Sequence, residues 1–465
     1  MKQINLRKLV KVNHIYFLIP LVIGITYWLS FYPGVMTYDS LYQWSQLSEF
    51  NFTDWHPAYH TIIMWMVTRL WNSPASISLF QILVFSLIIS YGTKVFKEEL
   101  KVSDYILIPT VFFISLHPIN GMMMVTLWKD VLYSYSLLII TIMLLKLITT
   151  RGGYILKTWP FFGIVLANIW LFRFNGLIPA IVIPVVCFLC FINYRKYFFY
   201  AFILMFTFFL IIKVPVYNVF RVNRVDSQPV AMSLLHPIAA HMNAQTEMTQ
   251  TEKEFLNKIH PIENWSYSCY DATVFFYTGI NIENIKKYPI FTLRTFLRFT
   301  ISKPHVTLSH YLCVSSFVWQ FNQPDGVFLE TIYFENSQDY HDWEKYKEDV
   351  VQQSQIPTIK YFIVDITDFL FNIDREKIFW RPAIYFSLLI IFTIILAWFR
   401  RNKLFLLLLI PILSQSFTIA FTTQLQALRY QYPIYIISML LSPIFMYLLI
   451  KGASEKLKKQ SKVDS

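Results

Sequence analysis

The sequence has few charged residues and few glycines. Only 15% of its 465 residues are charged, whereas 55% are hydrophobic and 18% aromatic, and this balance excludes a soluble domain of that size. The 11 glycines are outnumbered by 43 phenylalanines and 29 tyrosines, which favours long helices and aromatic belts at membrane interfaces. The composition therefore predicts an integral membrane protein.

Cysteine is also scarce, with four residues. Cys187 and Cys190 fall inside an apolar run, where packing is a more reasonable role than metal binding. Cys269 and Cys313 lie in a polar segment, and a pairing between them is an alternative. Because so sparse a set makes no disulfide framework, we expect free thiols.

The net charge of +12 does not indicate nucleic-acid binding. A nucleic-acid-binding protein clusters its Lys and Arg on one exposed face, but here these residues separate apolar runs. About ten such runs have the roughly 17 to 22 residues that a membrane-spanning helix needs. They lie near 14–32, 77–96, 104–119, 132–150, 157–173, 177–194, 197–217, 382–399, 404–421 and 432–450. The first run has a basic flank but no cleavage site, so we expect an uncleaved span.

The basic residues predict the orientation in the membrane. If the N-terminus is inside, most of them fall on cytoplasmic connections, and the short outer connections hold only Arg69, Lys129, Arg173 and Arg429. The positive-inside rule therefore places both termini in the cytoplasm of a cell-membrane protein that crosses several times. Counting 56–72 as a span would invert the later loops, so we expect a juxtamembrane helix there, with Pro57 in its first turn.

The same pattern divides the chain into three parts. Residues 1–217 form an N-terminal membrane module with a juxtamembrane outer loop at 33–76. Residues 218–380 form an extracytoplasmic segment, which we expect to be mostly helical and to rest on the membrane because 289–300 and 357–372 are amphipathic. Residues 381–465 form a C-terminal membrane module with a basic cytoplasmic tail.

Unusual polar residues collect on the outer connections. Ionisable groups at membrane depth are costly, and their default interpretation is a functional site. Each one also has a simpler explanation: Asp39 caps a helix that runs from Ser40, Lys129 and Asp130 form an interfacial ion pair, and Arg173 and Arg429 anchor helix ends at lipid phosphates. Their shared location favours the functional interpretation. The candidate residues are Asp39, Asp54, His56, Lys129, Asp130, Arg173, Asn175, Arg429 and Tyr430.

Transfer of a group from an anionic donor uses such a set. A phosphate leaving group is stabilised by fixed guanidinium and ammonium donors, which Lys129, Arg173 and Arg429 supply. An incoming hydroxyl group needs a carboxylate that takes its proton, and Asp39 is the candidate.

These residues resemble those of GT-C type membrane glycosyltransferases, the group that includes protein O-mannosyltransferases and the lipid A aminoarabinose transferases. The shared frame is an acid early in the first outer loop (Asp39), a His-Pro element (His56-Pro57), an Asp in the second outer loop (Asp130) and an Arg-Tyr pair before the last span (Arg429-Tyr430). The pattern PG-x4-DS-x2-Q followed by DWHP is also similar to a poorly characterised group of Gram-positive membrane proteins. The family's Asp-Glu pair is Asp39-Ser40 here, which puts metal dependence in doubt, and its doubled proline is Pro57-Ala58.

The resemblance implies an all-α, multi-span helical bundle and an inverting transferase. The donor is a polyprenyl-phosphate-linked sugar and the acceptor a glycan or glycolipid of the cell envelope, in a bacterial membrane. Asp39 is then the catalytic base, Asp54 and Asp130 orient hydroxyl groups, and Lys129, Arg173 and Arg429 hold the phosphate. The other binding residues are His56, Asn175 and Tyr430. The partners are the donor, the acceptor and membrane lipids, without nucleic acid. No cofactor is certain, and a divalent metal remains open.

Two other classes of function stay open. A transporter or flippase of lipid-linked sugars is expected to carry polar residues through the depth of the membrane, whereas these spans are nearly free of charge in their middles. A membrane acyltransferase or polysaccharide polymerase is the second class. An acyltransferase is expected to use a histidine base, for which His56, His117 and His236 are available.

Overall fold

The computed structural model describes residues 14–224, 228–272, 279–322, 332–371, 380–423 and 425–461. These residues form helices joined by turns, and the backbone pairing between distant segments that we find among them is limited to three isolated bridges. Within these described residues, seven stretches are long and apolar enough to cross a membrane. The predicted all-α membrane protein is therefore confirmed at the level of fold class. The basic flank at 1–13 lies outside the described residues.

The seven candidate spans are of two kinds. Four are single helices: α4 (Pro74–Leu100), α7 (Lys129–Thr149), α8 (Ile155–Phe172) and α22 (Pro382–Phe399). Three include 3-10 or π turns. Ile192–Val219 contains η3 (Ile192–Tyr194), α10 (Arg195–Ile211), η4 (Ile212–Val216) and α11 (Tyr217–Val219); Lys403–Thr422 contains η6 (Lys403–Leu409) and α23 (Ile410–Thr422); Leu428–Glu455 contains η7 (Leu428–Gln431) and most of α24 (Tyr432–Ser461).

The other apolar runs form a bent pair and two shorter helices. α5 (Asp104–Leu116) and α6 (Pro118–Val125) meet at an angle of 59°. The bend falls at His117 (φ −58°, ψ 126°), because a residue before proline disfavours the helical conformation. α1 (His14–Ser30) is shorter, as is Phe174–Cys190, which contains η2 (Phe174–Gly176) and α9 (Leu177–Cys190). Each predicted run thus falls on helical structure, but length and composition qualify seven or eight spans.

Helix α7 lies at the centre of the bundle because it is apolar on every face. Its side chains from Asp130 to Ile148 are almost all buried, and it packs against α4, α8 and α24. Two ionisable residues, Lys129 and Asp130, begin this helix. The start of the central helix is therefore a buried and charged end of the bundle.

Two short helices lie beside that end. α2 (Tyr38–Glu49) and α3 (Ala58–Thr68) pack against each other, and α3 also packs against α4. The 11 residues of α3 reach about 16 Å, which is too short to cross a membrane. Residues 56–72 thus do not form a span in the structure.

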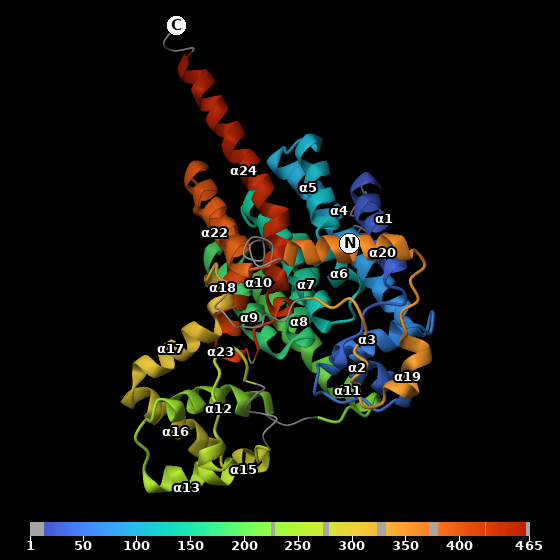
Figure 1. Cartoon of the computed structure of the whole chain (residues 1–465). Helices are drawn as coiled ribbons and strands as arrows, with labels where there is room; N and C mark the ends of the chain where they lie inside the picture. The colour runs from blue at the N-terminus through green and yellow to red at the C-terminus, as the bar shows by residue number, and fades with distance from the viewer. Residues whose placement is uncertain are drawn as a thin grey trace.

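The polar segment contains a separate helical unit at one end of the bundle (Figure 1). Its core joins Leu235, Leu256, Ile285 and Phe299. The helices of this region are α12 (Gln228–Asn243), α13 (Gln250–Ile259), η5 (Ile262–Asn264), α15 (Ile282–Lys287), α16 (Pro289–Ser302), α17 (Pro304–Val314) and α18 (Ser316–Trp319).

Residues 332–371 pack elsewhere, against the first loop. Asn336 Oδ1 accepts a hydrogen bond from the backbone N–H of Met36 at 2.8 Å, and Tyr340 and Tyr346 share a core with Trp44. This part contains α19 (Trp343–Val350) and α20 (Pro357–Phe371). The segment between the two membrane modules therefore contacts the bundle through two different surfaces.

Candidate functional site

Two backbone hydrogen bonds join the first and second predicted outer loops. The N–H of Val35 donates to Val125 O at 2.9 Å, and the N–H of Leu127 donates to Val35 O at 3.0 Å. Trp128 Nε1 then donates to Thr37 Oγ1 at 2.7 Å. Because these contacts hold the segments in register, the start of α2 lies beside the start of α7.

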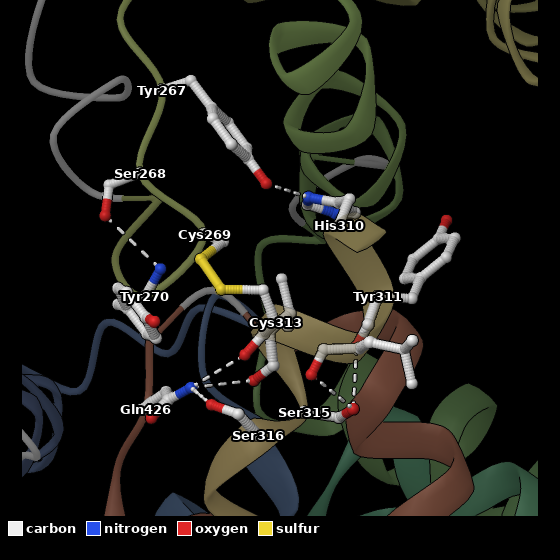
Figure 2. The surroundings of a disulfide bond; sticks show 12 residues. Tyr267, Ser268, Cys269, Tyr270, His310, Tyr311, Cys313, Ser315, Ser316 and Gln426 are labelled. Atoms are coloured by element: carbon white, nitrogen blue, oxygen red, sulfur yellow. Dashed lines mark hydrogen bonds between the residues drawn. A yellow bond between two sulfur atoms is a disulfide. The ribbon is translucent and has the colours of Figure 1, made fainter. Parts of the chain in front are cut away.

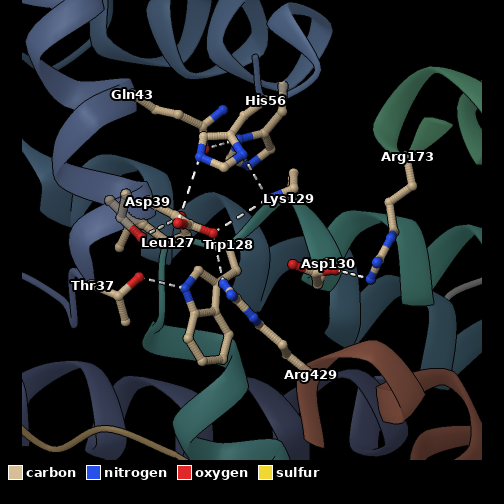
Figure 3. A network of polar contacts seen from close by, with 12 residues as sticks. Thr37, Asp39, Gln43, His56, Leu127, Trp128, Lys129, Asp130, Arg173 and Arg429 are labelled. Carbon is tan, nitrogen blue, oxygen red and sulfur yellow. Dashed lines mark hydrogen bonds and ion pairs between the residues drawn. The ribbon is translucent and has the colours of Figure 1, made fainter. Parts of the chain in front are cut away.

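Asp39 is at the centre of the polar cluster (Figure 3). Its Oδ2 accepts a hydrogen bond from Arg429 at 2.7 Å and lies 3.5 Å from Lys129 Nζ, while its Oδ1 lies 3.5 Å from His56 Nε2. The N-cap of α2 is Thr37, so the interpretation of Asp39 as a helix cap is wrong. Its carboxylate instead joins three loops of the chain.

The contacts of His56 define its protonation. Lys129 Nζ lies 3.2 Å from His56 Nδ1, and because an ammonium group only donates, this nitrogen accepts. Burial, followed by the Lys129 charge, lowers the pKa of His56 to about 3. The imidazole is therefore neutral, with its proton on Nε2 facing Asp39.

The surroundings of Asp39 fix its charge. Burial raises the pKa of this carboxyl group, but the charges of Arg429 and Lys129 lower it by more, so the pKa lies well below its usual range. Asp39 is thus ionised. An anion that attracts Arg429 and Lys129 away from it would make the carboxylate a better proton acceptor.

A second buried ion pair lies next to the first. Asp130 is fully buried and pairs with Arg173, whose Nε also donates to Asn175 Oδ1 at 3.1 Å. The expected alternative of a Lys129–Asp130 pair is wrong, because Lys129 pairs with Asp39. Neighbouring residues at the start of a helix point in different directions. We find no hydrogen-bond partner for Asp130 Oδ2 among the described residues.

Aromatic rings hold both arginines. The Arg173 guanidinium carbon lies 4.7 Å from the centroid of Tyr430, and that of Arg429 lies 5.2 Å from the same ring. Arg429 also lies 5.0 Å from the ring of Trp128. Cation–π contacts of this kind restrict the guanidinium groups while leaving donors available.

Asp54 belongs to a different set of contacts. Its carboxylate accepts hydrogen bonds from Lys213 Nζ at 2.6 Å, Tyr217 Oη at 3.0 Å and the backbone N–H of Ala58 at 3.0 Å. These bonds tie the start of α3 to the end of the Ile192–Val219 stretch. Of the nine sequence-predicted residues, the structure brings eight together and directs Asp54 elsewhere.

A hollow of about 280 Å³ opens beside the cluster. Among the residues that the structure describes, its charged lining residues are Lys129 and Arg173, and no described carboxylate lines it. The five ionised groups of the cluster, three cations and two carboxylates, sum to +1. This lining suits an anion such as a phosphate. The lining residues are Trp55, His56, Pro57, Lys129, Arg173, Phe174, Asn175, Ser233 and Thr422.

Sequence reasoning missed several of these residues. Trp128 stands next to Lys129 in the chain, so an aromatic residue beside a buried cation is a usable signal. Ser233 on α12 and Thr422 on α23 carry no such signal, because only packing brings them to the hollow. Among the described residues we find no group of three His, Cys, Asp or Glu side chains that could hold a metal ion.

Two histidines considered as bases lie away from this cluster. His117 Nε2 is 3.2 Å from Tyr385 Oη, and His236 Nε2 is 2.8 Å from Ser268 O. Only His56 of the three contacts the cluster.

A disulfide bond supports the segment that leads to Arg429 (Figure 2). Cys269 and Cys313 are bonded, so the expectation of free thiols is wrong; the pairing depends on how α17 packs, which the spacing of cysteines does not reveal. Gln426 Nε2 donates to Cys313 O at 3.1 Å and to Ser316 Oγ at 2.9 Å, and its N–H donates to Tyr270 O at 3.2 Å. Arg429 follows three residues later.

Comparison with known proteins found no matching family model, no matching curated protein and no matching solved structure.

Replacing Asp130 with Asn is expected to destabilise the protein by about 3 to 5 kcal/mol, because Arg173 would be left as a buried cation without its partner. Unfolding in detergent, followed by tryptophan fluorescence, measures the change. Lys286→Gln is the control, since Lys286 forms an exposed ion pair with Glu283, three residues away. Equal stability of D130N and K286Q would contradict the assignment of a buried pair.

Removing the disulfide through Cys269→Ser with Cys313→Ser is expected to cost about 2 to 4 kcal/mol, because the bond closes a loop with a sequence separation of 44 residues. A reducing agent applied to the wild-type protein should lower the unfolding temperature similarly. Cys190→Ser should have no effect, because Cys190 is an exposed free thiol. An unfolding temperature insensitive to reduction would show that the bond does not form.

Proposed function

We propose that the protein is an inverting glycosyltransferase that moves a sugar from a polyprenyl-phosphate donor to a glycan or glycolipid of the cell envelope. The observation that carries the proposal is the contact of Asp39 with Arg429 and Lys129 beside a hollow whose lining includes Lys129 and Arg173. It unites an acid with the cations that a phosphate leaving group needs. The GT-C resemblance of the sequence agrees with this reaction.

In the proposed reaction the donor phosphate enters the hollow and interacts with Lys129 and Arg173. An acceptor hydroxyl oxygen bonds to the anomeric carbon while the bond from that carbon to the phosphate oxygen breaks. The polyprenyl phosphate leaves with the electron pair, and the hydroxyl proton passes to Asp39. Arg429 and Lys129 stabilise the charge that develops on the phosphate, which also frees Asp39 to accept the proton.

The rival acyltransferase is less well supported. A histidine base needs a ring nitrogen free to accept the substrate proton. Nδ1 of His56 already accepts from Lys129, and Nε2 faces Asp39. A transporter is also less well supported, because the charges of this cluster gather at one end of the central helix.

The proposal includes a location: the cluster faces the outside of a bacterial cell membrane, and both termini are cytoplasmic. The distribution of Lys and Arg supports this orientation. The Cys269–Cys313 disulfide supports it independently, because such bonds persist in oxidising compartments.

Replacing Asp39 with Asn should reduce sugar transfer by about 10²- to 10⁴-fold, because the variant lacks the proton acceptor. The measurement is transfer of labelled sugar from polyprenyl-phosphate donor by purified protein in lipid. Asp365→Asn is the matched control, since Asp365 is an exposed residue of α20. Wild-type turnover by D39N would remove the proposed base.

Cys190 provides a test of the orientation, because it is an exposed thiol at the end of α9. A membrane-impermeant maleimide should label it in inverted membrane vesicles but not in intact cells. Cys190→Ser should abolish the labelling. Labelling in intact cells would place that end of the bundle outside and overturn the orientation.

A further inference from the structure

A larger hollow of about 690 Å³ lies at the other end of the bundle. We call it the arginine hollow; Arg151, Cys190, Phe191, Ile192, Asn193, Tyr194, Arg400, Arg401, Asn402 and Leu404 line it. Arg151 follows α7, whose first residue, Lys129, is in the candidate functional site. Because 21 helical residues rise about 31 Å, the two hollows are separated by about the thickness of a membrane.

The course of α22 agrees with this placement. The helix begins beside α18, where Arg381 Nε donates to Gln320 O at 3.2 Å. From there it runs away from α12, α13, α15 and α16 (Figure 1). Residues 400–404 follow its far end, so the arginine hollow lies on the face that the charge distribution assigns to the cytoplasm.

The lining of this hollow is strongly cationic. From the described part of the chain it contains three exposed guanidinium groups and no carboxylate. We find no ion pair or hydrogen bond from the side chains of Arg151, Arg400 or Arg401 to other described residues. Arg151 and Arg401 also adopt left-handed backbone conformations, with φ of 52° and 49°, where glycine is favoured after a helix. The fold thus concentrates like charges and leaves their donors available to a ligand.

The rest of the lining is apolar or neutral. Phe191, Ile192 and Leu404 line the hollow, and the side chains of Leu189 and Ile192 are 59% and 64% exposed. They continue the apolar surface of α9. An anion with an attached hydrocarbon chain fits such a surface better than free phosphate does. Its charged group contacts the guanidinium groups, and its hydrocarbon chain contacts the apolar residues.

We propose that the arginine hollow binds the phosphate headgroup of an anionic phospholipid from the leaflet at that face. The guanidinium groups hold the phosphate oxygens, and the acyl chains lie along the exposed apolar residues of α9. Basic pockets between membrane helices recognise anionic headgroups by this chemistry. The binding is independent of sugar transfer, so its test does not depend on the proposed function.

The test measures the unfolding temperature of delipidated protein in dodecyl maltoside micelles during titration with dioleoylphosphatidylglycerol. The phospholipid should raise the unfolding temperature, whereas dioleoylphosphatidylcholine should not. The double variant Arg400→Gln with Arg401→Gln should need an about tenfold higher phosphatidylglycerol concentration for the same shift. The variant that retains the charge, Arg400→Lys with Arg401→Lys, should keep most of the response.

Lys157→Gln is the matched control, because Lys157 is an exposed cation near the start of α8 that does not line the hollow. An equal shift with the neutral lipid, an equal loss in K157Q, or an unchanged response in the Arg400/Arg401→Gln double variant would each overturn the proposal. If glycerol 3-phosphate raises the unfolding temperature at the same concentration as the lipid, the ligand is a soluble phosphate compound and the assignment to a lipid is overturned.

Cys190 gives a second readout that does not depend on folding stability. This thiol lines the arginine hollow, so bound phosphatidylglycerol should slow its reaction with maleimide severalfold, and phosphatidylcholine should not. In the Arg400/Arg401→Gln double variant the protection should disappear. Protection that persists in that variant would contradict binding through the arginines.

Discussion

The contact between Asp39 and Arg429 is the interaction on which the site depends. It joins the first loop of the chain to the last, and the donor and acceptor atoms are 2.7 Å apart. Lys129 and His56 lie beside the same carboxylate. Tyr430, which follows Arg429, contacts the guanidinium groups of both Arg173 and Arg429 with its ring. A charge that is taken out of water needs a partner. This ion pair therefore holds the first and last loops together beside the start of α7.

Burying these charges costs free energy, and this cost favours a functional role for them. Replacing a buried ion pair with well-packed apolar residues is often neutral or stabilising. Stability alone therefore does not account for two such pairs beside the start of α7, which is the most buried of the seven candidate spans. The net charge of +1 and the uncharged partner Asn175 leave the cluster suited to receive an anion. The aromatic rings of Trp128 and Tyr430 restrict the arginines and so reduce the reorganisation that binding requires.

The two ends of the bundle differ in their chemistry. At one end, the Cys269–Cys313 disulfide and the hydrogen bonds of Gln426 brace the segment before Arg429. At the other end, Cys190 is a free thiol among arginines, and no acidic residue of the described ranges lines the same hollow. Oxidised cysteines on one side and a free exposed thiol on the other agree with a protein whose ends face different compartments.

The sequence by itself determined the helical membrane character, because the length and apolarity of a span are properties of consecutive residues. It also singled out Asp39 and seven further residues that the structure brings into the same cluster, since ionisable groups beside apolar runs are rare. Only the tertiary structure decided their partners: Lys129 turns to Asp39 rather than to the adjacent Asp130, Asp54 turns to Lys213, and Ser233 and Thr422 enter the hollow from distant helices. The disulfide and the arginine hollow were also decided by the tertiary structure alone. Each depends on how separate helices pack, and no local sequence pattern predicts that packing.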